Sequence, residues 1–179
     1  MPLIEGHAHS RVRAVIYDNL QCSDCLTLHN MLHETLLPAY GGNVTFEYRD
    51  FPSVKHIWAR PLAVAARYLA VQDPGVALQF RGQALNAIQV IRVSGLESFL
   101  REFAAANGID AGQMIAGMAD SGLALAVEAD CQEGMERGVR KTPTLYVNGQ
   151  AFIEHFTVEE VSKALEESLN SKKSGSWEQ

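Results

Sequence analysis

The order of the strand and helix patterns constrains the fold of this chain more than any other feature of its sequence. An apolar, partly β-branched run at residues 11–17 predicts a buried strand. Residues 22–36 then carry apolar side chains three to four positions apart, which predicts a helix, and residues 43–49 alternate as a second strand does. Strand, helix and strand in succession predict a βαβ unit with a right-handed crossover.

The C-terminal part of the chain returns to β-structure. Residues 144–153 predict two short strands joined by a hairpin turn at Asn148-Gly149. Thr157 and Glu160 then form the pattern of a capping box, which opens a final helix. This part of the chain is therefore expected to form a ββα unit.

The middle of the chain, residues 53–138, has the composition of helices. It is rich in alanine, leucine and glutamine and poor in strand patterns, and nothing in it repeats at the fixed period of a solenoid. We expect helices over about residues 54–71, 76–92, 96–106 and 124–137, with a short one after Asp110. The whole sequence thus predicts an α/β protein in which a helical segment separates a βαβ unit from a ββα unit.

Composition and charge argue against several classes of protein. Apolar residues make up 47% of the 179 residues and charged residues 20%, which is typical of a soluble globular protein. The net charge of −6 argues against a nucleic-acid partner, and the chain has no run of about 18 apolar residues that would predict a membrane span. Residues 1–10 lack the basic start and apolar block of a secretory signal, so we expect a cytoplasmic protein without a membrane partner.

Two of the three cysteines, Cys22 and Cys25, lie three positions apart where the first predicted helix begins. Three cysteines do not make a secreted disulfide scaffold, and a close pair in a reducing cytosol is more often catalytic or metal-binding than structural. The free N–H groups and positive dipole end of the helix favour a thiolate on Cys22, whereas Cys25 lies on the apolar stripe. We therefore expect Cys22 to be the more exposed of the two and the attacking sulfur, and Cys25 to resolve the mixed disulfide.

A metal site is the main alternative for this pair. Cys22, Cys25, His29 and His33 line one helical face at spacings of three and four residues, as four zinc ligands would. A straight helix separates Cys22 from His33 by about 16 Å, whereas zinc ligands lie about 2.0–2.3 Å from the ion, so one helix does not supply all four. A two-cysteine site shared by two molecules stays open. We interpret the histidines as helix surface or partial core, and Cys131 as a buried structural cysteine.

Three segments together carry a family resemblance. They are Cys-Ser-Asp-Cys at residues 22–25, Arg-Asp-Phe-Pro at residues 49–52, and residues 138–149, in which Thr142-Pro143 precedes a predicted strand. On these segments the chain resembles the DsbA-like branch of the thioredoxin superfamily, over about residues 12–169. The resemblance implies a thioredoxin fold (βαβ…ββα) with an inserted all-helical subdomain.

The resemblance also divides the chain into parts. Residues 11–52 and 139–170 form the thioredoxin-like domain, residues 53–138 the helical insertion, residues 1–10 a loose N-terminal arm, and residues 171–179 a disordered tail rich in serine, lysine and glycine. In this arrangement the insertion caps the core and borders a groove beside the cysteine pair.

A substrate-binding role for Thr142 and Pro143 follows from the same resemblance. It implies a cis bond before Pro143, with the proline facing the cysteine pair. The backbone of Thr142 then pairs with an extended substrate strand, which is a sequence-tolerant way to hold an unfolded polypeptide.

One position departs from the family pattern. Many thioredoxin-like proteins have a buried acid six residues before the first cysteine, and here that position is Ile16. Asp18 is near in sequence, but strand alternation does not by itself aim it at Cys25. The proton of the resolving thiol is therefore expected to pass to water or to Asp24.

Ser23 and Asp24, between the cysteines, are expected to tune the pair. A carboxylate about 8 Å from the Cys22 sulfur, at an effective dielectric constant of roughly 20–40, opposes the thiolate by about 1–2 kcal/mol. We therefore expect a milder oxidant than the strongly oxidising periplasmic members of the family, acting as a reductase or an isomerase.

The sequence thus predicts an enzyme, a protein-disulfide oxidoreductase that works through Cys22 without a metal or organic cofactor. Its expected partners are protein or peptide thiols and disulfides, with glutathione as a further candidate. Two alternatives stay open. One is a glutathione-dependent isomerase or transferase of the same architecture, whose sites usually have a serine where Cys22 stands. The other is a non-enzymatic module that binds peptides or a metal.

Overall fold

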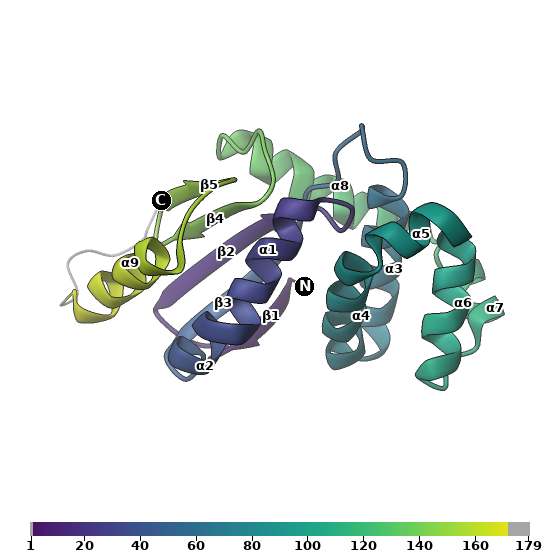
Figure 1. Cartoon of the computed structure of the whole chain (residues 1–179), viewed down its shortest axis with the longest axis horizontal. Helices are drawn as coiled ribbons and strands as arrows, with labels where there is room; N and C mark the ends of the chain where they lie inside the picture. The colour runs from purple at the N-terminus through teal and green to yellow at the C-terminus, as the bar shows by residue number, and fades with distance from the viewer. Residues whose placement is uncertain (1, 172–179) are drawn as a thin grey trace.

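The computed structural model describes residues 2–171 and contains a five-stranded sheet with helices on both faces (Figure 1). The strands follow the order β1-β3-β2-β4-β5; β2 and β3 run parallel, and the other neighbours are antiparallel. The strands are β1 (Leu3–Gly6), β2 (Val12–Asp18), β3 (Val44–Asp50), β4 (Thr144–Val147) and β5 (Gln150–Ile153). The predicted thioredoxin fold with a helical insertion is confirmed, with one additional strand at the start of the chain.

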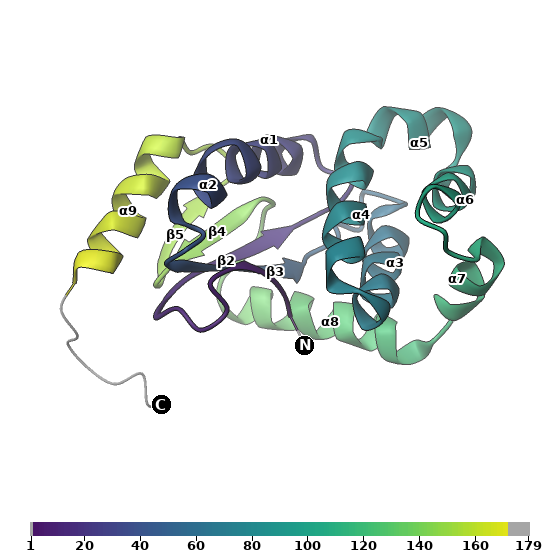
Figure 2. The same ribbon diagram turned by 90° about the horizontal axis from the view of Figure 1, so that it is seen from below.

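Helices flank the sheet and form a separate block beyond one end of its strands. Those that flank it are α1 (Ser23–Met31), the π-helical turn η1 (Leu32–Leu36), α2 (Leu37–Tyr40), α8 (Ser121–Glu136) and α9 (Val158–Asn170). The block contains α3 (Ala59–Gln72), α4 (Pro74–Asn86), α5 (Ile88–Ser94), α6 (Leu96–Ala106) and α7 (Ala111–Gly117). Figure 2 shows α1 and α2 on one side of the sheet and α8 along the other.

The first hydrophobic core lies between the sheet and the helices α1 and α9. Side chains alternate between the two faces of a strand, so every second residue of β2 points toward these helices. Val12, Ala14 and Ile16 are buried in one cluster with Leu28 of α1 and Leu165 of α9. The apolar run and the apolar helical stripe seen in the sequence thus form the two sides of this core.

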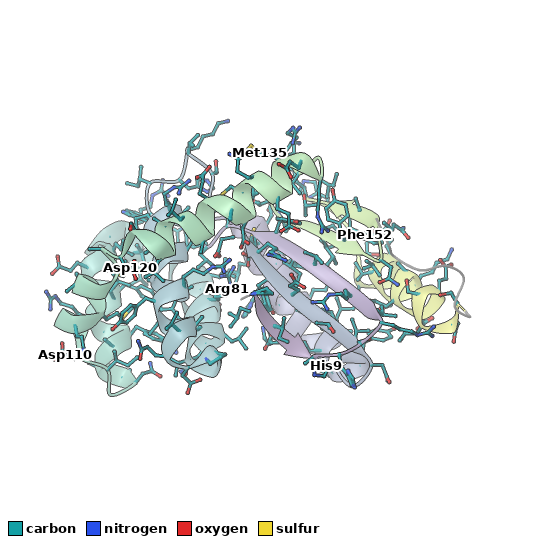
Figure 3. All side chains as sticks on the ribbon, turned by 180° about the vertical axis from the view of Figure 1, so that it is seen from behind. His9, Arg81, Asp110, Asp120, Met135 and Phe152 are labelled. Atoms are coloured by element: carbon teal, nitrogen blue, oxygen red, sulfur yellow. The ribbon has the colours of Figure 1, made fainter. Side chains whose placement is uncertain are left out.

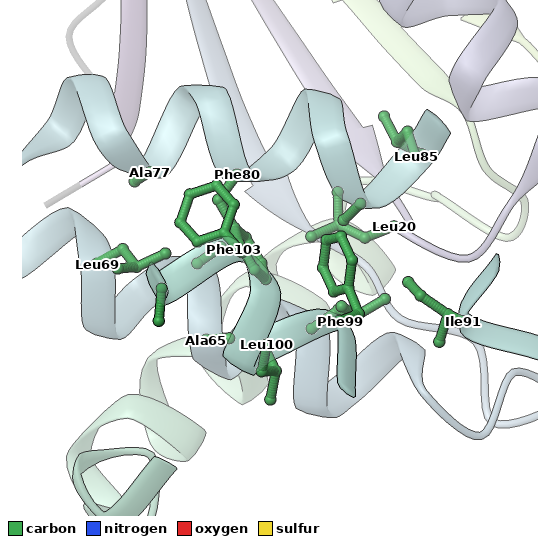
Figure 4. Packing of buried hydrophobic residues seen from close by; sticks show 14 of the residues in the cluster. Leu20, Ala65, Leu69, Ala77, Phe80, Leu85, Ile91, Phe99, Leu100 and Phe103 are labelled. Carbon is green, nitrogen blue, oxygen red and sulfur yellow. The ribbon is translucent and has the colours of Figure 1, made fainter. Parts of the chain in front are cut away.

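A second core fills the helical block and extends to the cysteine pair. Phe80 of α4 packs against Phe103 of α6 with ring centroids 4.9 Å apart. Leu20, from the segment before α1, lies within the same cluster (Figure 4). Cys22 and Cys25 also belong to it. The cysteine pair therefore sits where the thioredoxin core meets the helical block.

The expectation of a loose N-terminal arm at residues 1–10 is wrong for residues 3–6. They form β1, which pairs antiparallel with β3 and places Leu3 opposite Tyr48. Without β1, one edge of β3 would expose unpaired backbone N–H and C=O groups, which β1 satisfies. A single Leu-Ile pair is too short an apolar pattern to reveal such a strand in the sequence.

Two predicted helices differ from the observed ones. The helix expected from residue 54 begins at Ala59, because residues 53–58 form a loop that contacts the segment before α1. The helix expected over 76–92 consists of α4 and α5, which are separated at Ala87. The ranges predicted for α6, β4 and β5 agree with the structure.

Helix α8 contacts both parts of the molecule. At its C-terminal end Gly134 lies against the sheet, where an added Cβ would be 2.9 Å from the Phe51 ring and 3.0 Å from Tyr17. In its middle, Val127 packs with Ala63 and Val64 of α3. The predicted insertion, residues 53–138, includes this helix, so the domain division at these residues stays a prediction.

Two further expectations concern the membrane and the chain end. None of the helices within residues 2–171 has the length and apolar character needed to cross a membrane. The tail predicted to be disordered, residues 171–179, lies outside the described residues except for Ser171, whose backbone N–H donates to the carbonyl oxygen of Glu167.

Candidate active site

The segment after β2 places the cysteine pair at the start of α1. Cys22 is the N-cap residue, with an extended backbone (φ −103°, ψ 125°), and Cys25 lies in the first turn of the helix. Cys22 is 9% exposed and Cys25 is 1% exposed. Both cysteines are buried, and Cys22 is the more exposed of the two, as its place at the helix end predicts.

Neighbouring groups favour the thiolate of Cys22. A hydrogen bond from the Cys25 thiol has the largest effect, and the backbone N–H groups of Cys25 and Asp24 add to it. Together with a contact to Thr142, these hydrogen bonds outweigh burial and lower the pKa of Cys22 to about 6. This pKa lies within the range of about 3.5–7.5 typical of activated cysteines, so most Cys22 is a thiolate at pH 7.

Cys25 has the opposite character. Burial raises its pKa well above the ordinary value, and the hydrogen bond to Cys22 and the charge of Asp18 act in the same direction. The backbone N–H of Asn19, which lies 3.4 Å from the Cys25 sulfur, offsets only part of this effect. The pair therefore combines one thiolate with one thiol that donates a hydrogen bond to it.

Thr142 and Pro143 lie beside Cys22, although 120 residues separate Thr142 from it in sequence. The Cys22 Sγ is 3.5 Å from the carbonyl oxygen of Thr142, and the peptide bond between Thr142 and Pro143 is cis. Pro143 is buried and directly precedes β4, while Thr142 is half-buried. Both residues thus occupy the place that the family resemblance implies, and their role in substrate binding stays a prediction.

Ser23 and Asp24 occupy the first turn of α1. Ser23 is exposed and Asp24 is half-buried. The backbone N–H of Asp24 contributes to the low pKa of Cys22. Tuning of the pair by the Asp24 carboxylate stays a prediction.

Side chains that the sequence patterns did not single out hold the segment before α1 in place. The Asn19 side-chain amide is 2.8 Å from Nδ1 of His56, and the backbone N–H of Trp58 donates to the Gln21 side chain at 2.7 Å. These contacts join the segment to the loop at residues 53–58. Single polar residues in loops carry no periodic signal, so the sequence offers no way to find such contacts.

Asp18 is a buried acid one residue before the backbone N–H that contacts the Cys25 sulfur. Ile16, at the position where thioredoxin-like proteins often have an acid, is part of the core. Asp18 ends β2, is 6% exposed and forms an ion pair with Arg81 of α4. Burial raises the pKa of Asp18 to about 6, and Arg81 limits this rise. Because the charge of Asp18 acts on Cys25, it belongs to the site even though strand alternation gives no such indication.

The two histidines of the metal alternative lie in consecutive helical segments, His29 in α1 and His33 in η1. Their ring centroids are 4.2 Å apart, and His33 Nε2 is 3.7 Å from a carboxylate oxygen of Glu5. Burial lowers the pKa of His29 to about 4. Within residues 2–171, no group of three or more histidine, cysteine, aspartate or glutamate side chains is placed to hold a metal ion.

Cys131 lies in a different cluster from the cysteine pair. It is buried in α8 beside Ala63, Val64 and Val127, and its sulfur is 3.7 Å from the carbonyl oxygen of Asp50. Burial raises the pKa of Cys131 to about 11. A thiol with this pKa stays protonated at neutral pH, which agrees with a structural role.

Comparison with known proteins relates the chain to one family. Its sequence matches a family model described as Thioredoxin over residues 1–167, and no protein with a curated description matches it. Similar solved structures include alpha-DsbA2, a thiol-disulfide exchange protein from Wolbachia pipientis. It is 20% identical, has a TM-score of 0.79, and the match covers 93% of this chain and 86% of that one.

Two more solved structures match to a similar extent. BdbD from Bacillus subtilis is 16% identical, with a TM-score of 0.82 and 95% and 94% of the two chains covered. A thioredoxin-like oxidoreductase from Silicibacter pomeroyi is 17% identical, with a TM-score of 0.76 and 96% and 94% covered. At these identities the structural likeness shows the fold, and the family model covers nearly the whole sequence. The chain therefore belongs to the thioredoxin family and has the DsbA-like fold, in which a block of helices interrupts the thioredoxin core.

Proposed function

We propose that this protein is a thiol–disulfide oxidoreductase that exchanges disulfides with protein or peptide thiols through Cys22 and Cys25. The observation that carries the proposal is the unequal acidity of two sulfurs held together at one helix end. Cys22 has a pKa of about 6, whereas the pKa of Cys25 lies well above its ordinary value. Such a pair supplies a nucleophilic thiolate, which attacks the substrate disulfide, and a protonated second thiol, which reacts after the mixed disulfide has formed.

The reaction proceeds in two exchanges. The Cys22 thiolate attacks one sulfur of a substrate disulfide, the substrate S–S bond breaks, and the other substrate sulfur leaves as a thiolate. Cys25 then loses its proton and attacks the Cys22 sulfur, which forms the Cys22–Cys25 disulfide and releases the second substrate thiolate. The same steps in reverse oxidise a dithiol substrate and reduce the enzyme.

The site offers a place for the substrate backbone beside the attacking sulfur. The Thr142 carbonyl oxygen lies 3.5 Å from Cys22 Sγ in the segment that leads into β4. An extended polypeptide that lies along this segment brings its own cysteine next to Cys22. The substrate class is therefore a polypeptide with accessible cysteines.

We propose a mild oxidant or an isomerase within this class. A lower pKa of the attacking cysteine stabilises the reduced form and makes a pair more oxidising, and activated cysteines span pKa values of about 3.5–7.5. The pKa of about 6 for Cys22 lies in the upper part of this range. Equilibration with a glutathione redox buffer measures the potential, and a value at the strongly oxidising end, near −120 mV, would contradict this part of the proposal.

Reduction of insulin by dithiothreitol, with and without the protein, tests the activity. We expect the native protein to accelerate precipitation of the reduced B chain, because it relays electrons from the small dithiol to the insulin disulfides. Cys22→Ser should abolish the acceleration. The matched control is Cys131→Ala, which removes the third thiol in a separate cluster and should retain it.

Two outcomes of this assay would change the assignment. If Cys22→Ser accelerates insulin reduction as well as the native protein does, the proposed function is wrong. If turnover requires glutathione and survives Cys25→Ser, the protein uses bound glutathione instead of its own second thiol.

A further inference from the structure

A chain of buried charges crosses from the sheet into the helical block directly beside the cysteine pair. Asp18 and Asp50 end the parallel strands β2 and β3 and lie opposite each other in the register. Two carboxylates buried on neighbouring strands in this way repel each other. Arg81 of α4 bridges them: its Nη2 pairs with Asp18, and its Nη1 lies 2.7 Å from Asp50. Figure 3 shows Arg81 where the helical block meets the strands.

The two carboxylates depend on Arg81 to different degrees. Asp50 has a second cationic partner, since Nε of Arg67 in α3 lies 2.6 Å from its other oxygen. Within residues 2–171, Asp18 forms an ion pair with Arg81 alone. Its side chain is 7% exposed, so water replaces little of this interaction. Loss of Arg81 would therefore affect the ionisation of Asp18 more than that of Asp50.

Asp18 is also a carboxylate whose charge acts on Cys25. The backbone N–H of Asn19, the next residue, lies 3.4 Å from the Cys25 sulfur. Phe80, the residue before Arg81, shares a buried cluster with both cysteines. A buried carboxylate, paired with a helix of the insertion, thus lies one residue away from the backbone N–H that contacts the Cys25 sulfur.

We propose that Arg81 is a positioning residue for the dithiol: it holds Asp18 as a carboxylate beside Cys25, and that negative charge delays the resolving step. This inference rests on the proposed function. In the resolving step the Cys25 thiol loses its proton to solvent, its thiolate attacks Cys22 Sγ, and the substrate sulfur leaves. A negative charge close to Cys25 makes the first of these events less favourable.

The groups around Asp18 are consistent with this assignment. Those that face it are Arg81 from α4, Asp50 and Tyr48 from β3, and Cys22 and Cys25 from the start of α1. Arg81 is the one cation in this set, and the Cys22 charge disappears when Cys22 enters a mixed disulfide. In that intermediate the Asp18–Arg81 pair remains, and the charge of Asp18 acts together with burial on the pKa of Cys25. A mixed disulfide that persists gives the bound polypeptide time to rearrange its own disulfides, as an isomerase requires.

The resolving step is measured with an aromatic disulfide whose released thiol is coloured. The reduced protein releases one thiol when Cys22 attacks and a second when Cys25 resolves the adduct, so the two phases report the two sulfurs separately. The pH midpoint of the second phase follows the ionisation of Cys25. The comparison includes the native protein, Asp18→Asn, Arg81→Met, Arg81→Lys and the double variant Asp18→Asn/Arg81→Met.

We expect Asp18→Asn to lower the midpoint of the second phase by about 1 pH unit, the shift that one charge about 8 Å away produces at an effective dielectric constant of about 30. The rate at pH 7 then rises about tenfold. Arg81→Met should give the same shift, because the unpaired Asp18 beside Asp50 takes up a proton. Arg81→Lys, which keeps the positive charge, should retain the native midpoint.

The double variant should behave as Asp18→Asn does, because Arg81 acts through Asp18. Circular dichroism checks that each variant is folded. Asp18→Asn is nearly isosteric with the native side chain and decides the role of the charge even if Arg81→Met does not fold.

Other outcomes would overturn the proposal. An unchanged midpoint in Asp18→Asn removes the electrostatic role of this carboxylate. A slower second phase in Asp18→Asn shows that Asp18 accepts the Cys25 proton instead of opposing its loss. A shift in Asp18→Asn without one in folded Arg81→Met shows that Arg81 does not control Asp18. If the native protein shows no first phase of thiol release, the proposed function itself is contradicted.

Discussion

Cys22 is acidic because of its place in the backbone. As the N-cap of α1 it lies next to N–H groups that no helix carbonyl satisfies, and the Cys25 thiol one turn later donates to its sulfur. These donors outweigh the burial that on its own would favour the thiol. The chemistry of this residue therefore depends on the helix start staying intact.

The pH dependence of alkylation tests this acidity. The thiolate is the form that reacts, and a pKa lowered to about 6 means that it predominates above that pH and is lost as the pH falls below it. We expect the rate of Cys22 modification by iodoacetamide to rise about tenfold per pH unit up to a midpoint near 6 and then to level off. A midpoint near that of a free cysteine, about 8.5, would show that the helix end does not activate Cys22.

At the scale of single residues, the sequence predicts the part of the site whose residues are close together in the chain. It does not predict the part whose residues are far apart in the chain. Cys22 is the N-cap and Cys25 lies in the first turn of the same helix, so their spacing suffices to assign their positions. The Asp18–Arg81 pair joins residues 63 positions apart, and no local pattern couples a strand end to a helix of the insertion. Arg81, as a charged residue in a predicted helix, looks like a solvent-facing position until the fold shows that it is 4% exposed.

Short hydrogen-bonding motifs fix the ends of several secondary-structure elements. The hydroxyl of Thr157 accepts a hydrogen bond from the backbone N–H of Glu160, and the Glu160 carboxylate accepts one from the backbone N–H of Thr157. This capping box begins α9, whose Val161 and Leu165 pack against the sheet. It is readable in the sequence because all of its atoms lie within four residues.

Removal of the cap should loosen this helix without altering the active site. We expect Thr157→Ala to lower the free energy of unfolding by about 1 kcal/mol, as loss of an N-cap hydrogen bond does. Thr157→Ser keeps the hydroxyl and should remain within about 0.5 kcal/mol of the native protein. Urea unfolding followed by circular dichroism measures both, and equal stabilities of the alanine and native proteins would contradict the role of the cap.

Elements whose signal is not local are the ones that sequence reasoning misses. Strand β1 exists because β3 has an edge to fill, and the break between α4 and α5 occurs at Ala87, whose φ of −92° and ψ of 8° depart from the helical conformation. The turn η1 is a π-helical segment that ends at Leu36, two residues before Pro38, which lacks a backbone N–H. Apolar periodicity predicts one straight helix across η1 and across the break at Ala87, because it reports burial and not direction.

Across the whole molecule, buried ion pairs connect the sheet to the helical block. Asp130 of α8 accepts hydrogen bonds from the backbone N–H of Asp50 at 2.8 Å and from Arg49 at 3.1 Å, and it pairs with Arg67 of α3. Asp130 is 4% exposed. The network therefore joins β3, α3 and α8 at the level where the cysteine pair lies.

Removal of the Asp130 carboxylate from this network should lower the stability of the whole protein. We expect Asp130→Ala to lower the free energy of unfolding by about 2 kcal/mol, because it removes one partner of Arg67 and of Arg49 and leaves the buried backbone N–H of Asp50 without its acceptor. The control is Glu97→Ala, which removes an exposed pair with Arg101 and should change stability by less than about 0.5 kcal/mol. Urea unfolding of both variants compares them, and a similar small loss in each would show that the network does not hold the two parts together.

The general architecture follows from the order of elements, because a βαβ unit and a ββα unit have few ways to share one sheet. The placement of α8 does not follow from it, since this helix contacts α3 and the sheet at once. Its sequence shows an apolar pattern but not the identity of the surfaces that it covers. The boundary between core and insertion is for this reason the least predictable feature of the molecule.

The central claim is that Cys22 attacks the substrate disulfide and Cys25 releases the product. Capture of the mixed disulfide between Cys22 and a substrate tests it most directly. Cys25→Ser leaves the attacking sulfur in place and removes the one that releases the substrate. When reduced Cys25→Ser is mixed with a disulfide-bonded peptide, intact mass spectrometry should show one peptide attached, through Cys22, and a reductant should remove it. No adduct, or an adduct that forms equally with Cys22→Ser/Cys25→Ser, would contradict the account.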